Sequence, residues 1–187
     1  MQKIILASQS PRRKQLLEWA EVEFEVQVKE TDESFPGGLS FEDAAIHIAR
    51  NKARAVIMNN TSQLPILAAD TIVVCEDQLI GKPKDRDDAI RILQLLSGNS
   101  HRVITGVCIL HAGDEILFAD STDVTFNILT DEQIGFYVDK YKPYDKAGAY
   151  AIQEWIGVTG IRSISGDFYN VMGLPVNRVV RALQAIS

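Results

Sequence analysis

The chain has 187 residues, and 46% of them are hydrophobic, which is enough to bury a core as one domain of ordinary size. Its 19 Lys and Arg residues against 25 Asp and Glu residues give a net charge of −6, which argues against nucleic acid or an acidic membrane binding to the surface as a whole. Any anionic ligand must therefore be bound by a local group of cationic side chains.

The two cysteines restrict the setting further. Cys75 and Cys108 each lie in an apolar run that predicts a buried strand, and they lack the spacing of metal ligands. This pattern is typical of a reducing compartment. Because no apolar run reaches the length of a signal peptide or a membrane span, we expect a cytoplasmic protein that contacts no membrane.

The chain begins with a short apolar strand, about residues 3–7, followed by a polar turn and a helix. Ser10 is a suitable N-cap, and Pro11 lies at the first helical position, where proline is best tolerated. Arg12 and Arg13 come next. The free N–H groups of a first helical turn, together with arginine side chains, favour phosphate or carboxylate groups. We interpret this segment as an anion-binding corner, although a plain strand-to-helix turn with solvated arginines has the same pattern.

Strands and helices alternate along the rest of the chain. The predicted strands cover about residues 22–28, 66–75, 103–110 and 115–126, and short strands separated by glycines cover 149–171. The predicted helices cover about residues 41–59, 86–96 and 130–141, with N-caps at Ser40 and Thr130, and a last helix begins at Pro175. Turns at residues 76–77 and 112–114 join antiparallel hairpins, so we expect an α/β fold with a mixed sheet.

Two charged residues interrupt apolar patterns. Lys52 falls in the middle of the apolar face of the helix predicted over 41–59, where its ammonium group either extends to the rim of the core or meets a counter-charge in a cleft. Asp70 interrupts the apolar strand 66–75, where a carboxylate must bind a metal, accept several hydrogen bonds or change its pKa. A backbone bulge is the alternative at Asp70.

Two more charged residues lie near turns. The hairpin after Asp70 brings Lys82 roughly opposite Thr71 or Ile72, and therefore near Asp70. Glu33 lies in an acidic turn that, alone, is typical of a solvated loop. Combined with Lys52 and the two arginines, these residues suit a polyphosphate with a divalent cation, because Mg²⁺ is bound by one or two carboxylates plus substrate phosphates. The sequence lacks the glycine loops of P-loop and dinucleotide-binding enzymes.

Several short motifs are spread over nearly the whole chain. They are Leu6–Arg13, Asp32–Ser34, Ala49–Ala53, Ala68–Val73, Gly81–Lys84, Leu96–Gly98 with His101, Asp145–Gln153 and Asn170–Pro175. In this order they closely resemble the Maf family of nucleoside triphosphate pyrophosphatases. The resemblance implies one Maf-like domain over residues 1–187, with an elongated mixed sheet flanked by helices, as in inosine triphosphatases, and two lobes with a deep cleft between them. It also implies a homodimer.

The resemblance further implies a reaction and the residues that perform it. A nucleoside triphosphate is hydrolysed to the monophosphate and pyrophosphate with a divalent cation, Mg²⁺, Mn²⁺ or Co²⁺. By position, the phosphates are bound by Ser8, Arg12, Arg13, Lys52 and Lys82, and the metal by Glu33 and Asp70. Asp70 is then the proton acceptor for the attacking water, and Lys52 and Lys82 assist the reaction as cations.

Substrate choice in the family depends on the segment that ends at Gln153. Members with an Ile-Gln pair, as at Ile152 and Gln153, act on dTTP and UTP, whereas members with Glu favour 7-methyl-GTP. The physical reason is that an amide can pair with the acceptor–donor–acceptor edge of uracil or thymine from both its ends. Thr71 and Arg12 correspond to further specificity positions. Ala151, where relatives often have Gly, narrows the pocket slightly.

Two other functions are compatible with the sequence. One is a house-cleaning pyrophosphatase that removes modified or noncanonical nucleotides. The other is a nucleotide-binding regulator of septum formation and cell division with little turnover. The carboxylate at Asp70 argues against a pure binder, because binding alone does not require a charged group in an apolar strand.

Overall fold

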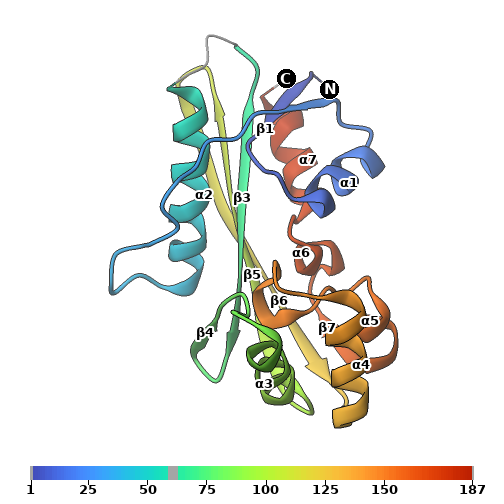
Figure 1. Cartoon of the computed structure of the whole chain (residues 1–187). Coiled ribbons are helices and arrows are strands. Elements are labelled where there is room, and N and C mark those ends of the chain that lie inside the picture. The colour runs from blue at the N-terminus through green and yellow to red at the C-terminus, as the bar shows by residue number, and fades with distance from the viewer. Residues whose placement is uncertain (1, 59–62, 187) are drawn as a thin grey trace. The chain divides into compact units, whose positions relative to one another are not determined.

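The computed structural model describes residues 2–58 and 63–186 and has a mixed α/β fold (Figure 1). The strands are β1 Ile4–Leu6, β2 Phe24–Val26, β3 Ile66–Cys75, β4 Gln78–Ile80, β5 Ser100–His111, β6 Asp114–Phe126 and β7 Ile161–Ser165. The helices are α1 Pro11–Trp19, α2 Phe41–Ile57, α3 Arg86–Leu96, α4 Asp131–Tyr141, α5 Trp155–Gly160, α6 Phe168–Met172 and α7 Val176–Ala185, with a 3-10 turn, η1, at Ala147–Ala149.

The sheet is mixed, as predicted from the hairpins. Its strand order is β2-β1-β3-β5-β6-β7, and β4 pairs with β3. Strand β1 is parallel to both β2 and β3, whereas the β3–β4 and β6–β7 pairs are antiparallel. The chain divides into two compact units: unit 1 contains residues 1–71, 105–120 and 173–187, and unit 2 contains residues 72–104 and 121–172.

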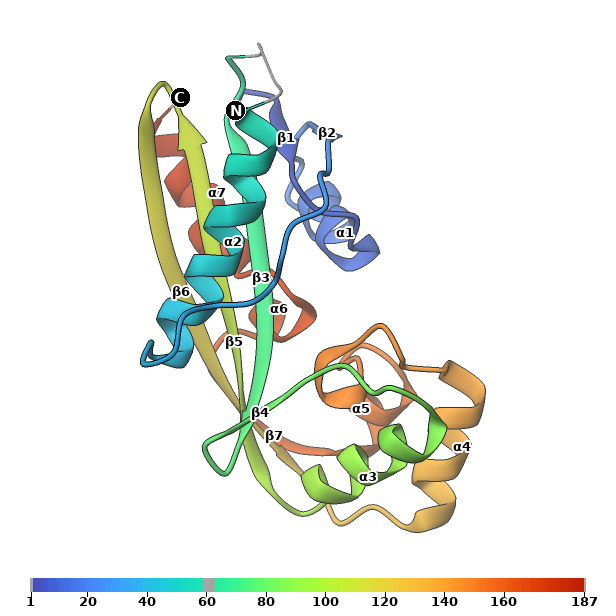
Figure 2. The same cartoon turned by 60° about the vertical axis from the view of Figure 1, so that its left-hand side comes forward.

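The core of unit 1 lies between its strands and α2. Figures 1 and 2 show α2 along one face of these strands and α7 along the other. The buried cluster under α2 comprises Ile5, Ala7, Ala49, Ala53, Val56, Ile66, Ala68, Cys108 and Leu110. Helix α2 approaches β5 so closely at Gly106 that a Cβ atom there would lie 2.2 Å from the backbone carbon of Ala45. This contact fixes the position of α2, and with it the position of Lys52.

Unit 2 packs α3 against α4 and η1. Its core contains an aromatic cluster in which His101 stacks on Phe126, and Tyr150 contacts both rings edge-on. Asn170, fully buried, donates hydrogen bonds to the Val103 carbonyl and to the Thr122 hydroxyl. Two members of the sequence motifs, His101 and Asn170, therefore have roles in the packing of unit 2.

The capping predictions are confirmed for two helices. The Ser40 hydroxyl accepts a hydrogen bond from the backbone N–H of Asp43 at the start of α2. Thr130 and Gln133 form a complete capping box at the start of α4. Ser10 lies at the N-cap of α1, but its side chain makes no capping hydrogen bond. The predicted end of the second helix at residue 59 lies outside the described residues.

Two predicted strand regions are wrong in extent or in type. The strand expected over 22–28 is reduced to β2, because only this short segment pairs with β1. The strands expected over 149–171 are replaced by α5 and α6, and only β7 is a strand. Gly157 belongs to a helical turn packed on the Ile152 carbonyl, where a Cβ atom would lie 1.7 Å from the oxygen. Glycine there permits a close approach rather than ending a strand.

Both cysteines are free buried thiols, as expected, and burial raises the pKa of Cys108 to about 12. No helix in the described part of the chain is long and apolar enough to cross a membrane. The prediction of a single domain over 1–187 and of a cleft between two lobes stays a prediction.

The buried His101 ring predicts a pH dependence of stability. Desolvation lowers its pKa from 6.5 to about 4, so the unfolded chain binds this proton more readily than the folded chain. The contribution to stability is therefore fully present above pH 6.5 and is lost as the pH falls toward 4, by as much as about 3 kcal/mol. Urea unfolding at several pH values measures this slope. His101→Gln flattens it, whereas His47→Gln, which replaces a half-buried histidine of α2, leaves it in place. An equal slope in all three proteins contradicts the assignment.

Candidate functional site

The candidate site is centred on the two residues in the middle of β3 that are not buried. Eight of the ten residues of β3 are buried, and the two that are not are Asp70 and Thr71. Because side chains alternate along a strand, Asp70 lies on the same face as Ile66 and Ala68, under α2, and Thr71 lies on the opposite face. The strand thus presents a carboxylate to one side and a hydroxyl to the other.

Lys52 meets a counter-charge, the second of the two arrangements expected for it. Its ammonium nitrogen lies 2.6 Å from Asp70 Oδ1 and 2.7 Å from Glu33 Oε1. The Lys52 and Asp70 side chains are 19% and 13% exposed, whereas Glu33 is 54% exposed. The Lys52–Asp70 pair is therefore largely shielded from water, and Glu33 closes it on the solvent side. All three residues were chosen from the sequence, and the structure brings them together.

Arg13 is buried, and its guanidinium donates hydrogen bonds to three oxygen atoms of the protein. Its Nε donates to the Gly173 carbonyl at 2.8 Å, its Nη1 to Ser8 Oγ at 3.0 Å and its Nη2 to Thr71 Oγ1 at 3.1 Å. Burial lowers the pKa of the Arg13 guanidinium, and the nearby charge of Asp70 opposes this shift. The sequence predicts a phosphate contact for Arg13, and this stays a prediction; in the structure its guanidinium donates to three oxygen atoms of the protein.

Ser8 belongs to the same network. Its hydroxyl accepts from Arg13 and from the backbone N–H of Ser10 at 3.3 Å, and the side chain is buried. The predicted anion-binding corner is therefore organised around Arg13, whereas Arg12, one residue earlier, is half-buried. The two adjacent arginines have different environments and so different possible duties.

The carboxylates of Asp70 and Glu33 fit a divalent cation in their chemistry. Both supply oxygen atoms, the donors that Mg²⁺ and Mn²⁺ prefer, and both approach a single point, the Lys52 ammonium. Two carboxylates are too few to enclose a metal, and no cluster of three or more His, Cys, Asp or Glu residues suited to a metal occurs among residues 2–58 and 63–186. A cation here would take its remaining ligands from substrate phosphates and water.

Lys82 and Gln153 belong to unit 2. The β3–β4 ladder ends at the Val73–Ile80 pair, so Lys82 follows β4 as an exposed residue and is not part of the ladder. Its predicted proximity to Asp70 stays a prediction.

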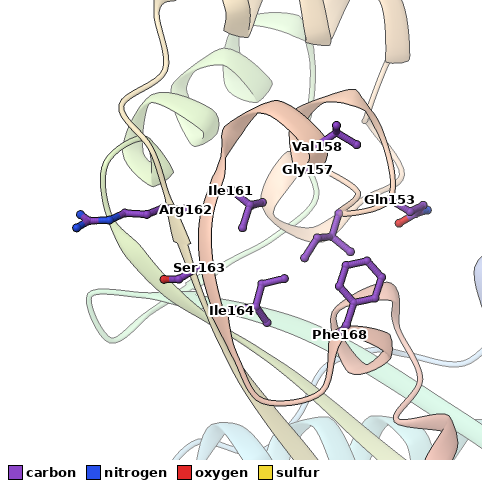
Figure 3. Close-up of a pocket in the computed structure, with 9 residues that line it drawn as sticks. Gln153, Gly157, Val158, Ile161, Arg162, Ser163, Ile164 and Phe168 are labelled. Atoms are coloured by element: carbon purple, nitrogen blue, oxygen red, sulfur yellow. The ribbon is translucent and has the colours of Figure 1, made fainter.

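Gln153 is exposed and lines a pocket of about 530 Å³ together with residues of α5, β7 and α6. Figure 3 shows Ile161, Ile164 and Phe168 turned toward one another in this pocket, with Gln153 at its edge.

Sequence reasoning missed two members of the site. Thr105 of β5 is fully buried, and its Oγ1 lies 2.9 Å from Thr71 Oγ1. Gly173 contributes its carbonyl oxygen to Arg13. Thr105 interrupts an apolar run as Asp70 does, so the same signal would have identified it. The role of the Gly173 carbonyl could not be predicted, because every residue has a backbone carbonyl and the sequence does not show which one accepts a given hydrogen bond.

Comparison with known proteins gives full-length matches. The family model described as Maf-like protein matches residues 3–186. A dTTP/UTP pyrophosphatase of Porphyromonas gingivalis strain W83 is 45% identical over 185 residues, covering 97% of this chain and 93% of the relative. A dTTP/UTP pyrophosphatase of Bacteroides fragilis strain YCH46 is 47% identical over 185 residues, covering 98% of this chain and 96% of the relative.

A solved structure confirms the fold. The Ham1 protein of Staphylococcus aureus superposes with a TM-score of 0.54 at 16% sequence identity, and the match covers 100% of both chains. At this level of identity the likeness concerns the α/β architecture alone.

Loss of the Lys52 ammonium has a predicted cost in stability. Lys52→Met leaves the carboxylates of Asp70 and Glu33 facing one another, and we expect the free energy of unfolding to fall by about 2–3 kcal/mol. Adding Asp70→Asn removes the shielded charge and recovers part of that loss. Urea unfolding at pH 7.5 measures both, and Lys29→Met, an exposed lysine of unit 1, is the matched control. A double variant no more stable than Lys52→Met is the contrary result.

Proposed function

This chain belongs to the Maf-like protein family, and on that basis we propose that it is a nucleoside triphosphate pyrophosphatase that hydrolyses dTTP and UTP to the monophosphate and pyrophosphate. The observation that supports this most directly is 45–47% identity, over nearly the full length of both chains, to dTTP/UTP pyrophosphatases. The Asp70–Lys52–Glu33 group supplies the charges that such a reaction requires.

The reaction proposed is attack of a water molecule on the α-phosphorus. The bond between the α-phosphorus and its bridging oxygen to the β-phosphorus breaks, and pyrophosphate leaves with the electron pair. Asp70 accepts the proton of the attacking water, since it is the carboxylate of β3, it is not fully buried, and Lys52 holds it in place. Lys52 fixes the orientation of Asp70 through Oδ1, which reduces the reorganisation needed when the water is bound.

A divalent cation fits beside these carboxylates. Glu33 and Asp70 would hold it together with the phosphates, and Mg²⁺, Mn²⁺ or Co²⁺ supplies charge neutralisation at the phosphate oxygens when bound. The protein's cations then act on the rest of the triphosphate. We assign Arg12 and Lys82 to direct phosphate binding, with Ser8 at the turn, and Arg13 to holding Ser8 in place, because its guanidinium is buried against three protein acceptors.

Base recognition is assigned to Gln153, with Thr71 and Arg12. An amide donates and accepts, so Gln153 can pair with the edge of uracil or thymine, and its place at the rim of the unit 2 pocket leaves it accessible to a ligand. We further propose that the protein acts in the cytoplasm as a homodimer. Removal of modified pyrimidine nucleotides is compatible with the same chemistry.

Replacement of Asp70 tests the mechanism. With purified protein, Mg²⁺ and dTTP, Asp70→Asn should release pyrophosphate about 10²–10⁴-fold more slowly than the natural chain, because it removes the proton acceptor. Circular dichroism should show an unchanged fold. Asp123→Asn, an exposed aspartate in a strand, is the matched control and should hydrolyse dTTP at the normal rate. Near-normal pyrophosphate release by Asp70→Asn rules out its assigned role.

Failure of the natural chain to hydrolyse any common triphosphate with Mg²⁺, Mn²⁺ or Co²⁺ would favour a regulatory protein.

Exchange of the amide at Gln153 tests the substrate assignment. Gln153→Glu replaces a group that donates and accepts by one that only accepts, so kcat/KM for dTTP and UTP should fall at least about tenfold. A panel of triphosphates that includes 7-methyl-GTP shows whether preference moves toward a guanine edge. Gln133→Glu makes the same exchange in the capping box of α4, where either residue caps, and should change nothing. An unchanged panel for Gln153→Glu refutes its role in base recognition.

A further inference from the structure

The segment that carries Gln153 is hydrogen-bonded to one buried hydroxyl group. Tyr137 of α4 is fully buried, and its Oη accepts a hydrogen bond from the Ala151 backbone N–H at 3.1 Å. The same hydroxyl donates a hydrogen bond to the Glu154 carboxylate. Ala151 precedes Gln153 in the chain and Glu154 follows it directly. Tyr137 therefore binds the segment on both sides of Gln153.

The partners determine the direction of each of these two bonds. A backbone N–H only donates and an ionised carboxylate only accepts, so Tyr137 Oη accepts from Ala151 and gives its hydrogen to Glu154. A hydroxyl has one hydrogen and two acceptor positions. Both bonds can therefore form at once, and an acceptor position is left for a further neighbour of Tyr137.

The Glu154 carboxylate is bound through both of its oxygen atoms. Oε2 accepts from Tyr137, and Oε1 lies 3.8 Å from the ammonium nitrogen of Lys146, whose side chain is 11% exposed. Glu154 is also the N-cap residue of α5, but its side chain makes no capping hydrogen bond there. The carboxylate is directed to α4 instead, and it ties the start of α5 to that helix.

Backbone contacts hold the same segment. The Glu154 N–H donates to the Ala151 carbonyl at 3.0 Å, which closes a turn over residues 151–154. Gly157 of α5 packs on the Ile152 carbonyl so closely that a Cβ atom there would lie 1.7 Å from the oxygen. Ala151 and Ile152 are buried, whereas Gln153 is exposed. The turn thus presents Gln153 to solvent from a backbone that is fixed on both sides.

We propose that Tyr137 is a positioning residue that fixes the backbone of Gln153, so that the Gln153 amide is already in place when the base of a nucleotide binds. The inference rests on the proposed function, which assigns base recognition to Gln153 at the edge of the unit 2 pocket (Figure 3). Tyr137, Lys146 and the turn all belong to unit 2. Ordering a segment on binding costs affinity, and a segment that is already ordered avoids this cost.

The positioning is tested first without a ligand. The order parameter of the Gln153 backbone N–H, from ¹⁵N relaxation, should be about 0.85 in the natural chain and fall toward about 0.6 in Tyr137→Phe, which keeps the ring but not the hydroxyl. Tyr141→Phe is the matched control, because Tyr141 lies on the same helix and stacks on the Tyr137 ring. It should leave the order parameter unchanged. The same order parameter in all three proteins overturns the inference.

A double-mutant cycle then tests whether Tyr137 acts through Gln153. Isothermal titration with Mg²⁺ measures the Kd of α,β-imido-dUTP, an analogue that cannot be cleaved at the reacting bond. Tyr137→Phe should weaken binding about tenfold in the natural chain. In a Gln153→Ala background the same substitution should change Kd by no more than about twofold, because no amide is left to position. Equal weakening in both backgrounds, or no weakening in the natural chain, overturns the inference.

Variants of Glu154 test the other end of the hydrogen bond. Glu154→Gln keeps an oxygen that can accept from Tyr137 and should bind the analogue normally, whereas Glu154→Leu removes it and should behave like Tyr137→Phe. A Glu154→Gln variant that binds as weakly as Glu154→Leu contradicts the proposal. If Tyr137→Phe does not fold, Glu154→Leu takes its place in the cycle.

Failure of the proposed function gives a different result. Because the analogue is not hydrolysed, a natural chain that shows the coupling between Tyr137 and Gln153 but releases no pyrophosphate from dTTP contradicts the proposed function and leaves this inference standing. A natural chain that hydrolyses dTTP but shows no such coupling overturns the inference and leaves the proposed function standing. A natural chain that does not bind the analogue overturns the role of Tyr137 in recognition.

Discussion

The structure of the site depends on one ammonium group placed between two carboxylates. A charged aspartate in the middle of a strand covered on both faces is costly unless a partner is present, and Lys52 is that partner. Lys52 can reach Asp70 only because α2 lies close on the sheet, and the absence of a side chain at Gly106 permits that closeness. Core packing and site electrostatics therefore both depend on the close approach of α2 to the sheet.

The alternation of side chains along β3 places the charged residue and the hydroxyl residue of the site on opposite faces of the strand. Asp70 faces α2 and the charged group, whereas Thr71, the next residue, faces Arg13 and a network of neutral oxygens. Under the proposed function, the first group supplies reactivity and the second supplies hydrogen-bond geometry. Since one strand holds both, a change in its register by one residue would exchange the two functions. Under the proposed function, the single motif Ala68–Val73 therefore contributes to both chemistry and specificity.

The structural features that were predicted correctly from the sequence are those that depend on residue type and periodicity. The extents of β3, α3 and the capped helices followed from apolar patterns and N-caps, and Lys52 and Asp70 were identified because they broke such patterns. The 149–171 region was wrong because its glycines serve close packing, which cannot be distinguished from strand ends in sequence. The burial of Arg13 could not be predicted either, because two of its three acceptors, Thr71 and Gly173, lie 58 and 160 positions away in the sequence.

The bond from Arg13 to Gly173 joins residues 160 positions apart in the sequence. Contacts of such long range form late in folding, since most of the chain must be ordered before they close. During synthesis, the strand, the helix and the Lys52–Asp70 pair can all be made before the Gly173 carbonyl exists. The charged part of the site can thus assemble on a nascent chain before the Arg13 guanidinium meets its last acceptor, so the salt bridge forms earlier than the buried hydrogen-bond network.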